Sequence, residues 1–290
     1  MNESIINATS LITGHYNMYE NYKKIEEVST WLIVTIGLIL MPVAIFALSS
    51  LVKKDNVAPI FVINLLVSDV VQLCSLILLQ TDGTVSSIGD SMYSFSVVAS
   101  VGFMVCIALE RYLAIVWPLW YRTRRPVKMS LLLCAVVWTF PLFYLPLSKV
   151  MVSNGWLYLY FIISGILLLL PLPLLVFFLV GTLRALSASI SVRAEENRRI
   201  VGLLVLVLLI YTLLFLPSII FYLVHPRDLE VHFVAVLFSR LNPIADLFMY
   251  IFLRKGAVNH VWFCLCCCRK NRTIHQSSGL NVDKTVTTNL

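Results

Sequence analysis

The sequence predicts an all-α membrane protein, a seven-transmembrane helix bundle with a short amphipathic eighth helix. Hydrophobic residues make up 59% of the 290 residues and charged residues only 13%. A soluble domain of this composition would have too little polar surface, so lipid is the expected solvent. Seven apolar runs are long enough to cross a bilayer, and the loops between them are short.

The seven apolar runs follow one another along most of the chain. They cover residues 30–52, 58–80, 91–116, 129–148, 156–183, 199–224 and 232–253. Lipid offers no partner to backbone N–H and C=O groups, so each run is expected to be a helix. Prolines inside the runs predict helix kinks at Pro42, Pro141, Pro146, Pro171, Pro173, Pro217 and Pro243.

The runs divide the chain into four parts. We expect an extracellular N-terminal tail over 1–29, a seven-transmembrane domain over 30–253, an amphipathic helix with a cysteine cluster over 254–268, and a disordered cytoplasmic tail over 269–290. The first 28 residues contain no apolar stretch of signal-peptide length, so the first run is expected to act as an uncleaved signal-anchor.

Basic residues indicate the orientation in the membrane. Most of them fall in loops on one side, at Lys53, Lys54, Arg122, Arg124, Arg125, Lys128, Arg184, Arg193, Arg198, Arg199, Arg254 and Lys255. The positive-inside bias then places the N-terminus outside the cell and the C-terminus in the cytoplasm, in a multi-pass protein of the plasma membrane. Sequons at Asn2 and Asn7 predict glycosylation of the outer tail. The net charge of +7 lies in short clusters, so no nucleic-acid partner is expected.

The cysteines predict lipid attachment rather than a disulfide. None of the seven lies in a segment expected outside the cell, so no disulfide is predicted. Four of them follow the last run, at Cys264, Cys266, Cys267 and Cys268. Palmitoylation there would hold the amphipathic helix against membrane lipid. A zinc site is the alternative, but the spacing is too tight and no partner cluster is present.

Charged residues inside the apolar runs need partners or functions. Arg111 stands at the inner end of the third run, and the neighbouring Glu110 can supply its counter-charge. The alternative is an arginine whose side chain merely extends to the interface. Asp69 falls near mid-membrane, where a carboxylate costs about 2.5–3.5 kcal/mol on insertion scales.

These strings resemble the motifs of rhodopsin-like G-protein-coupled receptors. Glu110-Arg111-Tyr112 is similar to the switch at the end of the third helix, and Asn64 to Asp69 matches the pattern of the second. The stretches 117–126 and 237–252 resemble the Mas-related branch in particular. The resemblance covers residues 30 to 264. It implies a receptor, not an enzyme, that binds an extracellular ligand and activates a heterotrimeric G protein by helix rearrangement.

The resemblance also assigns residues to roles. It implies a G-protein coupling switch of Glu110, Arg111, Tyr112, Pro118, Leu119 and Tyr250. It places Asp69, Ser100, Asn242 and Asp246 in a buried polar cluster, here called the polar cluster. Their oxygens could hold a sodium ion as an allosteric cofactor, or form a hydrogen-bonded network in which two carboxyls share a proton. Pro217 matches the hinge of the sixth helix, with static packing as the alternative.

The implied ligand pocket contains Tyr93, Phe215 and Arg240. Arg240 lies six residues before Asp246, which places it nearly two turns farther out, at the floor of the extracellular cavity. One interpretation makes Arg240 the anchor of an anionic ligand group. The other has it satisfied internally, by Gln72 or by stacking on Tyr93.

The sequence departs from the class at several positions. Ser86 stands where most members have a disulfide cysteine, Leu247 replaces the usual proline, and the fourth and fifth runs contain no Asp or Glu to hold a cationic ligand. Other functions fit less well. A transporter or channel would need a continuous polar file, a retinal pigment needs a lysine in the last run, and an intramembrane enzyme needs a nucleophile pair or His-Glu-x-x-His motif.

Overall fold

The computed structural model describes residues 2–55, 60–117, 127–188 and 194–253, and these residues are almost entirely α-helical. The helices are α1 (Asn2–Asp55), α2 (Ile60–Leu79), α3 (Thr84–Val116), α5 (Val127–Ser153), α6 (Leu157–Leu169), α7 (Pro171–Ala188), α8 (Ala194–Leu223), α9 (Leu229–Arg240) and α10 (Asn242–Leu253). Pro118 and Leu119, the expected amphipathic helix and the four clustered cysteines lie outside the described residues.

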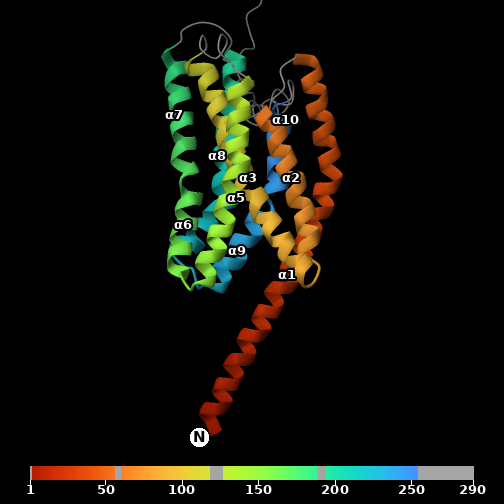
Figure 1. The fold of residues 1–290 in the computed structure, drawn as a ribbon, viewed down its shortest axis with the longest axis vertical. Coiled ribbons are helices and arrows are strands. Elements are labelled where there is room, and N and C mark those ends of the chain that lie inside the picture. Colours follow the sequence, from red (N-terminus) through yellow and green to blue (C-terminus); the bar gives the residue numbers. More distant parts are fainter. Residues whose placement is uncertain (1, 56–59, 118–126, 189–193, 254–290) are drawn as a thin grey trace, which may run out of the picture. The chain divides into compact units, whose positions relative to one another are not determined.

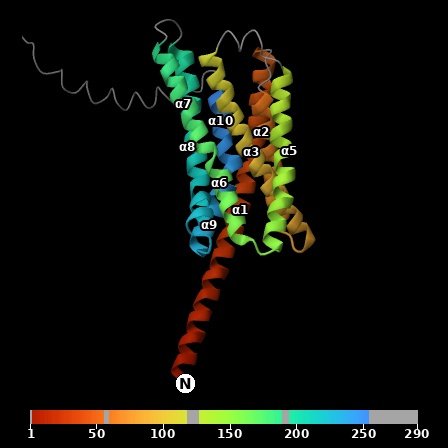
Figure 2. The ribbon, with the colours of Figure 1, turned by 60° about the vertical axis from the view of Figure 1, so that its left-hand side comes forward.

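The helices run alongside one another as a bundle (Figures 1 and 2). Within the described residues, six stretches are long and apolar enough to cross a membrane. The seventh crossing is divided into α9 and α10, of 12 residues each. A helix of that length extends about 18 Å, short of a hydrocarbon core of about 30 Å. Taken together they complete the crossing, and the predicted all-α seven-helix bundle is confirmed.

Prolines coincide with both interruptions of the crossings. Pro171 is the first residue of α7 and is separated from the end of α6 only by Leu170; at a first helical position its missing N–H costs nothing. Pro243 is the second residue of α10. Pro217, in contrast, lies inside a continuous α8. The predicted kinks at Pro171 and Pro243 therefore correspond to helix boundaries in this structure.

The first helix begins much earlier than the apolar run that predicted it. α1 is helical from Asn2, through the whole segment expected as a tail, and Figure 1 shows its N-terminal part projecting beyond the other helices. Residues 15–36 contain neither Gly nor Pro, and Glu20 and Lys24 are spaced for an i,i+4 ion pair. The helix can therefore continue into polar sequence, and it carries Glu26 and Thr30 to the bundle.

The apolar core lies between α2, α3 and α8. Its fully buried side chains include Leu65, Phe103, Ile107 and Leu214. Because lipid is as apolar as these side chains, close packing rather than water exclusion must hold the helices together. Gly102 of α3 illustrates this, since a Cβ added there would lie 2.7 Å from a methyl of Val137 on α5.

Candidate functional site

Asn242 at the start of α10 is the centre of a buried hydrogen-bond network. Its Nδ2 donates to Ser100 Oγ on α3 at 2.9 Å and to Gln72 Oε1 on α2 at 3.2 Å. Ser100 Oγ in turn donates to Asp246 Oδ2 at 3.2 Å. All four side chains are fully buried. The structure thus brings Ser100, Asn242 and Asp246 together, and adds Gln72, which the sequence did not assign to the cluster.

Tyr250 connects the same helix to Asp69. Its hydroxyl donates to Asp69 Oδ2 at 2.8 Å, and Asp69 is fully buried on α2. The sequence grouped Tyr250 with the coupling switch, whereas the structure places its hydroxyl on the polar cluster. Asn242, Asp246 and Tyr250 are spaced four residues apart, so α10 presents them on one face.

Three oxygens of the polar cluster are buried with no hydrogen-bond partner among the described residues: Asp69 Oδ1, Asp246 Oδ1 and Asn242 Oδ1. Buried polar atoms in native structures nearly always have partners, so these three need an explanation. Hard oxygen donors suit a small hard cation. A proton shared between the carboxyls would also satisfy part of the set. Among the described residues, no three His, Cys, Asp or Glu side chains are grouped so that they could hold a metal ion, so a cation would also need Ser100 or Asn242.

The expected switch residues lie at the end of α3. Glu110 is buried and Arg111 half-buried, and the Arg111 Nε has no hydrogen-bond partner in the part of the chain that the structure describes. The Tyr112 ring packs against Phe177 and Phe178 of α7, with centroids 5.7 and 5.4 Å away. Tyr112 is therefore packed against α7, and Arg111 is the residue before it on α3.

Arg240 forms an ion pair with the first helix. Its Nη2 lies 2.5 Å from Glu26 Oε1, and its Nη1 donates to Thr30 Oγ1 at 2.5 Å. The two residues that the sequence suggested as partners of Arg240 form other hydrogen bonds. Gln72 accepts from Asn242, and the Tyr93 hydroxyl donates to Ser239 Oγ at 3.4 Å. Arg240 as a whole is 8% exposed, and its side chain is 10% exposed.

The pairing with Glu26 was missed because residues 1–29 were expected to form a separate tail. Glu26 and Thr30 are four residues apart, which places them on one face of a helix. That spacing, directly before the first apolar run, is the signal that could have indicated the contact. Tyr22, one turn earlier, stacks on Phe233 of α9 with centroids 4.8 Å apart, so the same face continues outward.

The remaining pocket residues lie in different environments. Phe215 is 1% exposed, with its ring 5.0 Å from that of Tyr211 in the apolar core. Tyr93 is half-buried and meets Ser239, the residue before Arg240. Tyr93 and Arg240 therefore belong to one region, whereas Phe215 packs with its own helix near Pro217.

A brace between α2, α3 and α5 was also missed. Trp138 of α5 donates from Nε1 to Asn64 Oδ1 at 2.8 Å, and its ring stacks on Phe95 and meets Phe103 edge-on. Asn64 is the first residue of the Asn64–Asp69 motif, so the sequence indicated that this position matters. It did not indicate that the hydrogen-bond partner would be Trp138, 74 residues away.

Comparisons with known proteins agree with this architecture. Residues 42–154 match the family described as 7 transmembrane receptor (rhodopsin family). The chain is 26% identical over 146 residues to Mas-related G-protein coupled receptor member B5 of Mus musculus, covering 48% of this chain and 44% of the relative. It is 27% identical over 121 residues to Mas-related G-protein coupled receptor member X1 of Homo sapiens, covering 40% and 37%.

A longer match extends over most of the chain. It is with the human Proto-oncogene Mas, 21% identical over 274 residues and covering 84% of this chain and 83% of that protein. The chain spans less than half the length of the two Mas-related receptors named above. The family match over residues 42–154 and the bundle of membrane-crossing helices together make this multi-pass membrane protein similar to the rhodopsin family of seven-transmembrane receptors.

Proposed function

We propose that this chain transmits the binding of an extracellular ligand to a heterotrimeric G protein by rearranging its helices. The observation that carries the proposal is the polar cluster, in which α2, α3 and α10 meet through Asp69, Ser100 and Asn242. A buried network with unsatisfied oxygens has more than one arrangement of protons or ions available, which is what a two-state element requires.

The inner end of α3 is the proposed contact for the G protein. Arg111 keeps a buried Nε without a partner among the described residues. A guanidinium in this state gains hydrogen bonds when a partner helix arrives, and such differential contact would favour the conformation that binds the G protein. Pro118 and Leu119, which follow α3 in the sequence and lie outside the described residues, are proposed to complete the contact.

Pro217 is the proposed hinge. It lies inside α8, where it removes one backbone N–H and leaves a carbonyl one turn earlier without its usual donor. Outward movement of the half of α8 before Pro217 would open a cavity next to Arg111. The Phe215 and Tyr211 rings, packed together just before Pro217, would move with that half.

The orientation is proposed from the basic loops. It places the α2–α3 turn, the α5–α6 turn and the α8–α9 turn outside, with the N-terminus, and the C-terminus in the cytoplasm of the plasma membrane. Asn2 and Asn7 would then be available for glycosylation, and Cys264, Cys266, Cys267 and Cys268 for palmitoylation.

The proposed ligand region lies at the outer end of the bundle near Tyr93 and Arg240. Because Arg240 is held by Glu26 and Thr30, a ligand carboxylate could use it only by displacing Glu26. The ion pair therefore acts either as a structural tie or as a contact that an anionic ligand replaces.

A G-protein dissociation panel in cells tests the proposal. The wild-type chain, with and without peptide and lipid libraries, should dissociate at least one G-protein subtype, and Arg111→Ala should abolish that signal at equal surface expression. Arg184→Ala, an exposed arginine on α7 at the same end of the bundle, is the matched control and should signal normally. No dissociation of any subtype by well-expressed wild type, or full signalling by Arg111→Ala, would contradict the proposal.

A further inference from the structure

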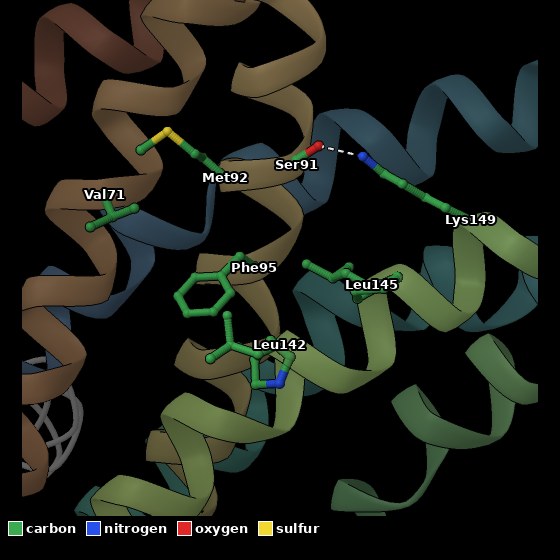
Figure 3. A pocket seen from close by; sticks show the side chains of 9 residues that line it. Val71, Ser91, Met92, Phe95, Leu142, Leu145 and Lys149 are labelled. Carbon is green, nitrogen blue, oxygen red and sulfur yellow. Dashed lines mark hydrogen bonds between the residues drawn. The ribbon is translucent and has the colours of Figure 1, made fainter.

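A groove on the outer surface of the bundle lies between α2, α3 and α5, apart from the polar cluster and Arg240. Its volume is about 540 Å³, and its walls are almost entirely apolar, with Val71, Phe95, Leu142 and Leu145 among them. Figure 3 shows the Phe95 ring and the Leu142 side chain facing each other across it. Leu142 is 58% exposed, so the groove opens away from the bundle, where lipid would surround it.

One end of the groove carries a positive charge. Lys149 reaches across this end, and its Nζ donates to Ser91 Oγ at 2.6 Å (Figure 3). Among the described residues, no carboxylate lies within salt-bridge distance of Lys149. A lysine ammonium has three N–H donors, and Ser91 accepts from one of them. The charge is thus anchored in position but not neutralised.

The wall of the groove is fixed by the brace behind it. The Phe95 ring stacks on Trp138 with centroids 5.7 Å apart and planes inclined by 20°. Trp138 is itself held through its donation to Asn64. A ligand would therefore meet a surface that is already formed, and would lose less free energy to side-chain ordering on binding.

The length of the groove matches one leaflet. Pro141 and Lys149, both in its lining, are eight residues apart on α5, which corresponds to about 12 Å along the helix. Half of the hydrocarbon core is about 15 Å. A chain lying in the groove would therefore extend from the charged end at the interface to near mid-membrane.

We infer that the groove binds a single-chain anionic lipid, with its acyl chain between α3 and α5 and its head group on Lys149. The inference rests on the orientation proposed above, which places Lys149 in the outer half of the membrane. Anionic bilayer lipids are concentrated in the cytoplasmic leaflet. The bilayer lipids next to Lys149 are then mostly neutral and leave its charge without a counter-charge. A ligand with an apolar chain and a negatively charged head group complements both the groove and the lysine.

Photo-crosslinking of the full chain in phosphatidylcholine nanodiscs tests the inference. The probe is dodecyl phosphate with a diazirine at the end of its chain, and the matched neutral probe is dodecanol with the same diazirine. The phosphate should label peptides of α3 and α5 around Phe95 and Pro141, about tenfold more strongly than the alcohol does, as expected for one charge-assisted hydrogen-bonded contact.

Three variants separate the head group from the chain. Lys149→Gln should lower labelling by the phosphate about tenfold and leave labelling by the alcohol unchanged, whereas Lys149→Arg should retain both. Leu142→Trp, which fills the groove, should abolish both. Lys24→Gln, which removes an exposed lysine of α1 at the same end of the bundle, is the control and should change neither.

Several results would overturn the inference. Equal labelling of wild type by the two probes would show that Lys149 does not bind the head group. This comparison uses only the wild-type chain, so it holds even where a variant fails to fold. Undiminished labelling of Lys149→Gln, crosslinks confined to other helices, or no labelling above that of lipid-facing surfaces would do the same. Reaction of Lys149 with an impermeant amine reagent on intact cells tests the orientation separately. Normal G-protein dissociation with no phosphate labelling would overturn the groove site alone.

Discussion

Each carboxylate of the polar cluster keeps one oxygen without a hydrogen-bond partner among the described residues. Asp69 Oδ1 and Asp246 Oδ1 are both buried, and Asn242 contributes a third such oxygen. Two fully ionised carboxylates here would be costly without a cation, because burial removes water and like charges repel. Bound sodium therefore predicts that stability depends on the sodium concentration, whereas a shared proton predicts that exchanging sodium for another cation has no effect.

The sodium version predicts that the folded chain is stabilised by sodium. Purified protein should melt at a Tm about 3 °C higher in sodium chloride than in choline chloride at equal ionic strength, because a ligand of the folded state stabilises it. Asp69→Asn should abolish the difference, while Asp90→Asn, an exposed acidic residue of α3, should not. Equal Tm values for wild type in the two salts would favour the proton-sharing network.

The ion pair between Glu26 and Arg240 predicts energetic coupling between α1 and α9. Arg240→Gln and Glu26→Gln should each lower the Tm, and the double variant should lose less than the sum of the two. The Glu26 side chain is 36% exposed, so solvent screening limits the expected coupling to about 1 kcal/mol. Additive losses, with ligand potency lowered only by Arg240→Gln, would instead identify Arg240 as an anionic-ligand anchor.

Contacts between whole helices in this bundle depend on close approach. α3 packs on α5 where Gly102 faces Val137, whose β-branched side chain has little rotamer freedom. The same pair of helices supplies Phe95 and Trp138 to the brace. Helix α10 depends on residue spacing instead. Asn242, its first residue, is four residues before Asp246 and eight before Tyr250, so the three side chains lie on one face of the helix.

Gly102→Ala should therefore destabilise the bundle despite the better helix propensity of alanine. The added Cβ would lie 2.7 Å from a Val137 methyl, and overpacking of this kind costs about 1–3 kcal/mol. Val137→Ala introduced together with Gly102→Ala should restore much of the loss, which thermal denaturation of the purified variants can measure. A single Gly102→Ala variant as stable as wild type would show that α3 and α5 are not in this contact.

Much of the molecule could be predicted from the sequence because lipid imposes a strong length and polarity pattern. The apolar runs indicated the bundle, and the motif resemblance brought Asp69, Ser100, Asn242 and Asp246 to one region. The polar extension of α1 carried no such pattern, so the contacts of Glu26 and Tyr22 were missed. Long-range partners such as Asn64 and Trp138 depend on helix packing, which residue types alone do not determine.

The central claim, that the chain signals by moving the part of α8 before Pro217, is tested most directly by a distance measurement. Spin labels at Trp117, the residue after α3, and at Val205 of α8, both exposed, report on the inner half, and labels at Ile88 and Ile220 report on the outer half. Cys74 and the four clustered cysteines would first be replaced by serine. Pulsed electron resonance would then compare the chain alone with its complex with a nucleotide-free G protein. We predict that the inner pair separates by about 5 Å, the size of a one-turn helix shift, while the outer pair changes little. An unchanged inner distance in a chain that has bound the G protein would contradict the account.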